Sequence, residues 1–443
     1  MLVLMRRTRP VPLVRLWPAA FVSSWGSEPM TRPCIRLRRG VVVAVTVGAL
    51  VGPAAGGVAA TLPYPAATAA AQPSPSPSED AVRALTPAVR GQIDQAVQRV
   101  MKEADIPGVS VGIWTPDKGE YVKSFGVADK STGEKMTPDL YMRIGSETKT
   151  FTVTALLELV DEGRIGLDDT IDQYVDGVPN GDRITLRQLA GMRSGLFNYS
   201  EDEGFFKALT SDPERPFTPQ QLLGYSFKHP VMFQPGAQFY YSNTNLILLG
   251  LVVEKVSGRR LADYIQEHVL DPVGLKHTLF PTGNEFPEPH AQGYTDQTAT
   301  GKVEDSADWN PSWGWAAGAM ISRLEDLRVW ARTVATGRLP DGGTLISPAT
   351  QKQRLTTPPT PIPGAGYGLG IFNVQGWIGH NGSLPGYESL TVYLPSAQAT
   401  LVVVLNTDIN YKGQEPSTVL GDAITKIISP DHVFNLPAQP AAR

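Results

Sequence analysis

Apolar and polar positions at the two ends of the chain predict a helix and a β-hairpin at each end. Near the start, Thr86 and Pro87 form an N-cap followed by a proline at the first helical position. Apolar residues then recur at helical spacing to about Ala104, at Val89, Ile93, Val97 and Val100. The stretches "VSVGIW" (109–114) and "EYVKSFGVA" (120–128) flank "TPDKG" and predict a hairpin.

The far end repeats this combination. "SLTVYLP" (389–395) and "TLVVVLN" (400–406) flank "SAQA" as a second hairpin, and a helix follows over about 416–428. The middle of the chain is rich in helices and loops, and no internal repeat is present. These patterns predict an α+β fold, with one antiparallel sheet built from both chain ends, flanked by helices, and a mainly helical lobe inserted between them.

The first 60 residues have the pattern of an over-extended start followed by a signal peptide. Residues 40–60 carry no charge, basic residues precede them and small residues follow. Met30 is a natural start, and cleavage is expected near Ala60 or Ala71, although a retained membrane anchor is the alternative. An Ala/Pro/Ser-rich linker (61–82), a folded domain (83–430) and a C-terminal tail (431–443) complete the predicted organisation.

Charge and cysteine usage narrow the possible functions. The chain has a formal net charge of −4, which becomes −11 without the first 60 residues, because these hold eight Arg and one Glu. An acidic exported protein is a poor candidate for nucleic-acid binding. The single cysteine, Cys34, precedes the apolar run, so the exported part has neither a disulfide nor a thiolate nucleophile. The six histidines show no metal-ligand spacing, so no metal and no cofactor are expected.

The stretch "RIGSETKTFT" (143–152) places Ser146 one helical turn before Lys149, where an apolar helical run begins. Residues three apart share a helix face, and a helix N-terminus favours negative charge. Lys149 could therefore accept the Ser146 proton or stabilise the developing anion, which is the logic of a serine nucleophile that uses lysine. The alternative, favoured for these two residues alone, is that Ser146 caps the helix and Lys149 is solvated.

Two further stretches carry candidate chemistry. Tyr241 and Asn243 precede another apolar helical run, where a phenol could relay a proton and an amide could hold a carbonyl. His380 and Gly382 lie ahead of the final strands, where glycine would allow close approach of substrate and histidine would add a donor or a pH-dependent charge. Each stretch alone also fits an ordinary helix start or a Gly-rich turn. Ser-x-x-Lys, Tyr-x-Asn and His-x-Gly each occur once in the chain, in this order.

The three motifs together resemble those of the penicillin-recognising serine hydrolases, which include D-alanyl-D-alanine carboxypeptidases, class C β-lactamases and related esterases. The resemblance covers roughly residues 85–430 and is greatest to the secreted class C-type DD-peptidases. Further stretches extend it: "LLELVDEGRIGLDDTIDQYV" (156–175), "ITLRQLAGMRSGL" (184–196), "FQPGAQFYYSNTN" (233–245), "WAAGAMISRLEDL" (315–327) and "YGLGI" (367–371). It implies a β-lactamase/transpeptidase-like fold for the predicted domain.

The resemblance also implies roles for the motif residues. Ser146 would be the acylated nucleophile, Lys149 and Tyr241 would share the proton relay, and Asn243 would orient the acyl amide. The backbone N–H groups of Ser146 and Ser383 would form the oxyanion hole. His380 stands where many relatives carry lysine, and no Glu-x-x-Leu-Asn of class A β-lactamases occurs.

One departure from the family concerns the substrate. Secreted DD-carboxypeptidases are expected to carry an arginine just after the Tyr-Gly-Leu-Gly run, where it binds the terminal carboxylate, but this chain has Phe372 there. No Lys or Arg lies between Tyr367 and His380, which raises the odds of an esterase or aminopeptidase-like relative. Trp309, Trp313 and Trp315 either line the cleft or pack between lobes.

These observations predict a secreted serine hydrolase of the D-alanyl-D-alanine carboxypeptidase type, acting on small peptides or esters and inhibited by β-lactams. An esterase or a class C-like β-lactamase is the alternative, and an inactive wall-binding homologue is the non-enzyme alternative. An α/β-hydrolase is disfavoured because the one Gly-x-Ser-x-Gly, "GVSVG" (108–112), falls in a strand of the first predicted hairpin and not at a strand-to-helix turn. No nucleic-acid partner is expected, and a membrane partner only if the signal is retained.

Overall fold

The computed structural model describes residues 81–436. The predicted signal peptide, Cys34 and most of the predicted linker lie outside the described residues. In the described part of the chain, no helix combines the length and the apolar character needed to cross a membrane.

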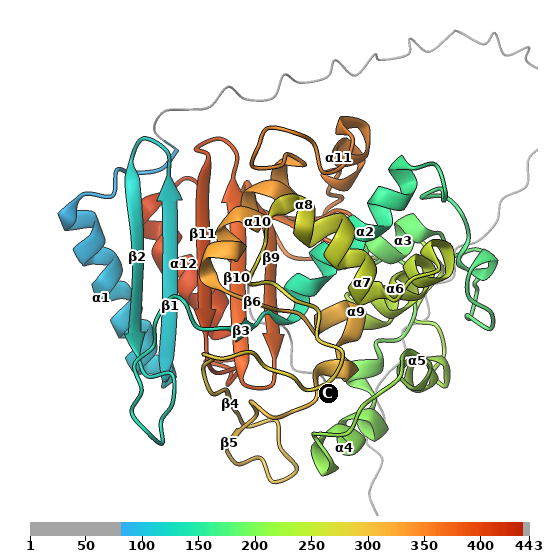
Figure 1. Cartoon of the computed structure of the whole chain (residues 1–443), viewed down its shortest axis with the longest axis horizontal. Helices are drawn as coiled ribbons and strands as arrows, with labels where there is room; N and C mark the ends of the chain where they lie inside the picture. The colour runs from blue at the N-terminus through green and yellow to red at the C-terminus, as the bar shows by residue number, and fades with distance from the viewer. Residues whose placement is uncertain (1–80, 437–443) are drawn as a thin grey trace, which may run out of the picture. The chain divides into compact units, whose positions relative to one another are not determined.

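A seven-stranded antiparallel sheet in the order β2-β1-β11-β10-β9-β8-β7 forms the centre of the fold (Figure 1). Its strands are β1 (Gly108–Thr115), β2 (Gly119–Gly126), β7 (Ala365–Tyr367), β8 (Phe372–Val374), β9 (Trp377–Leu384), β10 (Tyr387–Leu394) and β11 (Ala399–Leu405). Two small two-stranded sheets accompany it: β3 (Met142–Arg143) with β6 (Ile321–Ser322), and β4 (Tyr294–Thr295) with β5 (Glu304–Asp305).

Helices cover both faces of the large sheet. In Figure 1, α10 lies in front of β9, β10, β11 and β1, whereas α12 packs behind β10 and β11 with α1 beside it. The remaining helices form the lobe to one side of the sheet, around α2 and α6. The helices are α1 (Pro87–Ala104), α2 (Thr148–Asp161), α3 (Leu186–Ala190), α4 (Glu203–Ser211), α5 (Pro219–Phe227), α6 (Asn243–Ser257), α7 (Leu261–Ile265), α8 (Asp271–Val273), α9 (Trp315–Gly318), α10 (Leu324–Thr336), α11 (Pro348–Arg354) and α12 (Pro416–Ile428).

The prediction that both chain ends build one sheet is confirmed. β1 from the N-terminal hairpin pairs with β11 from the C-terminal hairpin, with Val111 opposite Val403. Every residue of β1, β10 and β11 is buried, because helices cover both faces of these strands. This explains why their sequences are nearly continuous apolar runs rather than alternating ones.

The His-x-Gly stretch lies directly ahead of the two final strands, as expected, but it is itself a strand, so the alternative of a Gly-rich turn is wrong. His380, Asn381, Gly382 and Ser383 belong to strand β9, which pairs with β10 along its length and with β8 only over Trp377–Gly379. Where β8 stops, β9 approaches the turn that contains Ser146. The active-site motif therefore lies on a regular element, at a place where the strand lacks its second partner.

Candidate active site

Ser146 lies in a 3₁₀ turn, Gly145–Glu147, immediately before α2. The turn contacts strand β9 closely: a Cβ atom at Gly145 would lie 2.7 Å from the Ser383 nitrogen, and one at Gly382 would lie 1.9 Å from the Ile144 carbonyl oxygen. Gly145 also has a φ of 49°, which favours glycine. Two glycines thus bring the Ser146 turn and the backbone of Ser383 together.

Lys149 contacts Ser146 directly. Its Nζ lies 2.7 Å from Ser146 Oγ and donates to the Ala317 carbonyl oxygen at 2.8 Å. Ser146 remains partly exposed, whereas Lys149 is 0% exposed, and burial lowers the pKa of its amine well below the ordinary value. The lowered pKa favours the uncharged amine, whose lone pair can accept the serine proton. The alternative of a capping serine and a solvated lysine is therefore wrong.

Tyr241 lies just before α6, with its ring centroid 4.9 Å from Lys149 Nζ. Burial raises the pKa of the Tyr241 phenol far above its ordinary value, the negative charge of Glu415 raises it further, and a hydrogen bond with Ser146 partly offsets both. The phenol therefore keeps its proton at neutral pH. Tyr241 can donate that proton near Ser146, but as a proton acceptor it is much weaker than uncharged Lys149.

Asn243 begins α6 next to this pair. Its backbone N–H donates to Asn198 Oδ1 and its side-chain amide donates to Ser200 Oγ, both at 3.0 Å. Its Oδ1 is buried and has no partner. A buried acceptor without a donor costs free energy, and a substrate N–H could satisfy it.

His380 lies on β9, and only 2% of it is exposed. Nδ1 contacts the Asn381 carbonyl oxygen at 2.5 Å, so it carries the proton, and Nε2 accepts from the Tyr367 hydroxyl at 3.2 Å. Burial, then the charge of Lys149, lowers the pKa of the imidazole to about 3. His380 is therefore neutral at pH 7, and the expected pH-dependent charge is absent there.

Aromatic rings surround His380. Phe372 starts β8 with its ring 5.0 Å from His380 and 4.6 Å from Tyr367.

Trp315 starts α9, and its indole packs against α6, where a Cβ at Gly250 would lie 2.8 Å from the ring. This contact fits the packing interpretation of Trp315.

The structure adds three residues that the sequence reasoning missed. Tyr367 bonds His380, and its place in "YGLGI" was the available signal. Glu147 follows the nucleophile and is 1% exposed, and burial raises its pKa to about 8. Glu415 accepts from the Asn381 amide at 2.6 Å, and no local pattern marks it.

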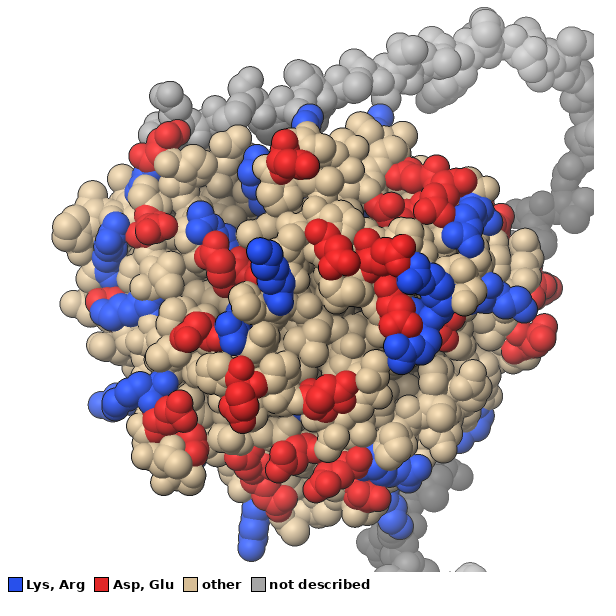
Figure 2. Space-filling model, in the orientation of Figure 1, with Lys and Arg blue, Asp and Glu red and all other residues tan. Residues whose placement is uncertain are grey.

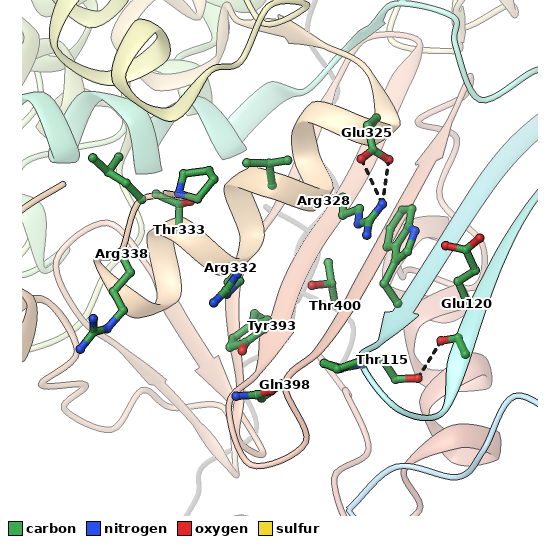
Figure 3. A pocket seen from close by; sticks show the side chains of 16 residues that line it. Thr115, Glu120, Glu325, Arg328, Arg332, Thr333, Arg338, Tyr393, Gln398 and Thr400 are labelled. Carbon is green, nitrogen blue, oxygen red and sulfur yellow. Dashed lines mark hydrogen bonds and ion pairs between the residues drawn. The ribbon is translucent and has the colours of Figure 1, made fainter. Parts of the chain in front are cut away.

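A cavity of about 630 Å³ lies away from this site, between α10 and the β1–β2 and β10–β11 hairpins (Figure 3). Three arginines, Arg328, Arg332 and Arg338, line it together with Glu120 and Glu325, and none of the motif residues does.

On the face shown in Figure 2, basic and acidic side chains are interspersed. Within residues 81–436, no group of three or more His, Cys, Asp or Glu side chains is placed to hold a metal ion.

A family model described as beta-lactamase matches residues 93–420. The chain belongs to the beta-lactamase family. The resemblance inferred from the three motifs and the predicted fold are both confirmed, and the family and the structural neighbours are serine hydrolases.

The family member is 29% identical over 335 residues to "Protein flp" of Staphylococcus aureus (strain MW2), a match that covers 74% of this chain and 65% of that protein. It thus spans about two thirds of the length of that relative. Among solved structures, it is similar to a D-stereospecific amidohydrolase from a Streptomyces species, with a TM-score of 0.65 and 31% identity over 72% of this chain and 94% of that one.

Two other solved structures broaden the comparison. A D-amino acid amidase from Ochrobactrum anthropi SV3 gives a TM-score of 0.67 at 26% identity, covering 77% of this chain and 96% of that one. The octameric penicillin-binding protein homologue from Pyrococcus abyssi gives 0.64 at 26% identity, covering 76% of each chain. The similar structures therefore include amidases as well as penicillin-binding relatives.

Proposed function

We propose that this beta-lactamase family member hydrolyses amide bonds of D-amino-acid peptides through an acyl-enzyme on Ser146, in a reaction of the D-alanyl-D-alanine peptidase type. The observation that carries the proposal is the 2.7 Å contact between Ser146 Oγ and the buried amine of Lys149. Because this amine has a strongly lowered pKa, it can take the serine proton at neutral pH.

The proposed reaction proceeds in two stages. Ser146 Oγ bonds to the substrate carbonyl carbon as its proton passes to Lys149 Nζ, and the backbone N–H groups of Ser146 and Ser383 stabilise the oxyanion. The bond to the leaving group then breaks as the Tyr241 hydroxyl gives the leaving group a proton, which Lys149 replaces. Water next attacks the acyl carbon, releases the acid and returns a proton to Ser146 Oγ.

The substrate class rests on the similar structures and on the site. Two of them are named a D-stereospecific amidohydrolase and a D-amino acid amidase, and a third a penicillin-binding protein homologue. Asn243 Oδ1, buried without a partner, suits the N–H of an acyl amide. Phe372, a buried apolar residue where an arginine was expected, favours esterase activity as the second candidate, with class C-like β-lactamase activity beside it.

The remaining predictions complete the proposal. The signal predicted in residues 1–60 would deliver the enzyme to the cell envelope, and a retained signal would tether it to the membrane. β-Lactams would acylate Ser146 and act as inhibitors, because their strained amide is attacked in the same way as a peptide.

The test is covalent labelling with a fluorescent penicillin and a fluorophosphonate, read by intact mass. Wild-type protein and a control variant of the exposed Ser131, Ser131→Ala, should gain one adduct, whereas Ser146→Ala should gain none and its hydrolysis should fall to background. An adduct on Ser146→Ala would show that another serine is acylated. Absence of labelling and turnover in the wild type would favour the inactive wall-binding homologue.

A further inference from the structure

Glu415, just before α12, touches the strand that carries the His-x-Gly motif. Asn381, between His380 and Gly382 on β9, donates its side-chain amide to Glu415 Oε2 at 2.6 Å. Glu415 is partly exposed, and no described residue forms an ion pair with it. An acidic side chain therefore lies beside the strand that carries the His-x-Gly motif, with no ion-pair partner among the described residues.

A second carboxyl group lies behind Glu415 and shows where the negative charge resides. Glu388 on β10 is 1% exposed and accepts from the Ser417 backbone N–H at 2.7 Å. Burial and the charge of Glu415 raise the pKa of Glu388 well above its ordinary value, which favours the protonated form of Glu388. Burial also raises the pKa of Glu415, but less than that of Glu388, and the Asn381 donor opposes this rise, so Glu415 is the member of the pair that ionises more readily.

The charge of Glu415 reaches the reacting groups. It raises the pKa of the Tyr241 phenol, which lies beside Lys149 and Ser146. His380, which precedes Asn381 on β9, is uncharged at neutral pH and therefore provides no positive charge to oppose that of Glu415.

The nearby arginines have other partners. Arg354 is buried and donates to the Thr150 carbonyl oxygen, while Arg143 donates to the Ala307 and Trp309 carbonyl oxygens. Arg323 stacks on the Tyr141 ring at 3.8 Å. None of these described contacts brings a guanidinium to Glu415 or His380.

We propose that Glu415, held by Asn381, is a specificity-determining residue that selects an uncharged or cationic leaving group and disfavours one with a free carboxylate. This inference rests on the proposed function and names its substrate class: peptides blocked at the C-terminus as amides. A carboxylate leaving group would approach a like charge on a partly buried side chain, where repulsion is less screened than in bulk water. An amide N–H or an ammonium group could instead donate to the second oxygen of Glu415.

The experiment compares matched peptides that share one acyl group and end in D-Ala-D-Ala, either as the free acid or as the C-terminal amide. Wild type should prefer the amide at least tenfold in kcat/KM at pH 7.5. Glu415→Gln keeps an oxygen acceptor for Asn381 but removes the charge, so the preference should fall to within about threefold, mainly through faster turnover of the free acid. Thermal unfolding shows whether the variant is folded.

Glu388→Gln is the matched control, since the raised pKa of Glu388 favours its uncharged form and its replacement should leave the ratio unchanged. A wild type that prefers the free acid, a ratio unchanged in folded Glu415→Gln, or an equal shift in Glu388→Gln would overturn the inference while the acyl-enzyme on Ser146 stands. Absence of Ser146-dependent turnover of both peptides would instead contradict the proposed function, and this inference with it.

Discussion

The cleft around Ser146 and the cavity beside α10 differ in how far their ionisable side chains are exposed to solvent. In the cleft, Lys149 and His380 are almost completely buried, and burial lowers the pKa of both, that of His380 to about 3 and that of Lys149 well below its ordinary value. In the cavity, Arg332 and Arg338 are exposed, and Arg328 pairs with Glu325 at 3.1 Å. The cavity is thus a solvated charged surface, whereas the cleft holds its ionisable groups away from water.

This difference shows why the volume of a cavity is a poor guide to chemistry. Charged groups in water keep their ordinary state at little cost, but burial of an amine or imidazole favours the neutral form. A neutral lysine beside a serine is costly to maintain and useful as a base. The displaced pKa values and the partnerless Asn243 oxygen therefore mark the cleft as the reactive region.

The largest expected effect in this comparison comes from removing the proton relay. Lys149→Ala and Tyr241→Phe should each lower kcat by roughly 10² or more, because general acid–base catalysis contributes about 10²–10⁴-fold. Their effects should be non-additive in the double variant, since both residues act on one proton path. Steady-state kinetics on an activated ester and on a D-Ala-D-Ala peptide would measure this.

Tyr241→Phe distinguishes the two members of the relay. The structure makes Lys149 the acceptor and Tyr241 a donor, so activated esters with good leaving groups should lose less activity in Tyr241→Phe than peptides do. Near wild-type turnover of both substrates in Tyr241→Phe would remove the phenol from the mechanism.

The sheet was predictable from the sequence because its strands carry the evidence locally. β1, β10 and β11 are mainly apolar runs, β2 mixes polar and apolar residues, and short turns join the four strands in two hairpins. β9 was missed as a strand because "WIGHNGSLPG" contains glycines, Asn and Pro, which are depleted in strands. Its conformation depends on pairing with β10, a tertiary effect that single-sequence patterns do not carry.

The motif residues of the site were predictable for a different reason. Ser146 and Lys149 are one helical turn apart, so local spacing brings them together, and the other two motifs came from their family resemblance. The contact between Asn381 and Glu415 joins residues 34 positions apart that belong to different elements. The neutral state of His380 likewise follows from burial by Tyr367 and Phe372, which no spacing rule encodes.

A smaller expected effect concerns Glu147 and the pH dependence of the free energy of unfolding. The folded chain raises the pKa of Glu147 to about 8 by burial, against an ordinary value of 4.5. Between these values the unfolded chain releases the proton while the folded chain keeps it, so stability is full below about pH 4.5 and is lost as pH rises towards 8. Glu147→Gln removes this titration and should reduce the fall in unfolding free energy between pH 6 and 8 by roughly 1–3 kcal/mol.

Denaturant unfolding at pH 6 and 8 measures that difference. Glu134, which is exposed, provides the control Glu134→Gln, whose pH dependence should match the wild type. An identical fall in wild type and Glu147→Gln would mean that Glu147 is ionised in the folded protein. The cleft would then tolerate a buried charge next to its nucleophile, and the contrast with the solvated cavity would weaken.

The smallest expected effect belongs to the cavity itself. Arg332 lies on α10 and is exposed, and its charge lowers the pKa of the Tyr393 phenol only against a larger effect of burial. Arg332→Ala removes one positive charge, as Lys149→Ala removes one ionisable amine, but from a group that water already solvates. Its kcat/KM should stay within about twofold of the wild type and its unfolding free energy within about 0.5 kcal/mol, as is usual for exposed substitutions. Steady-state kinetics and denaturant unfolding of Arg332→Ala and Lys149→Ala, measured side by side, test this prediction. A tenfold loss of activity in Arg332→Ala would mean that the cavity takes part in substrate binding. The two regions would then not be functionally separate.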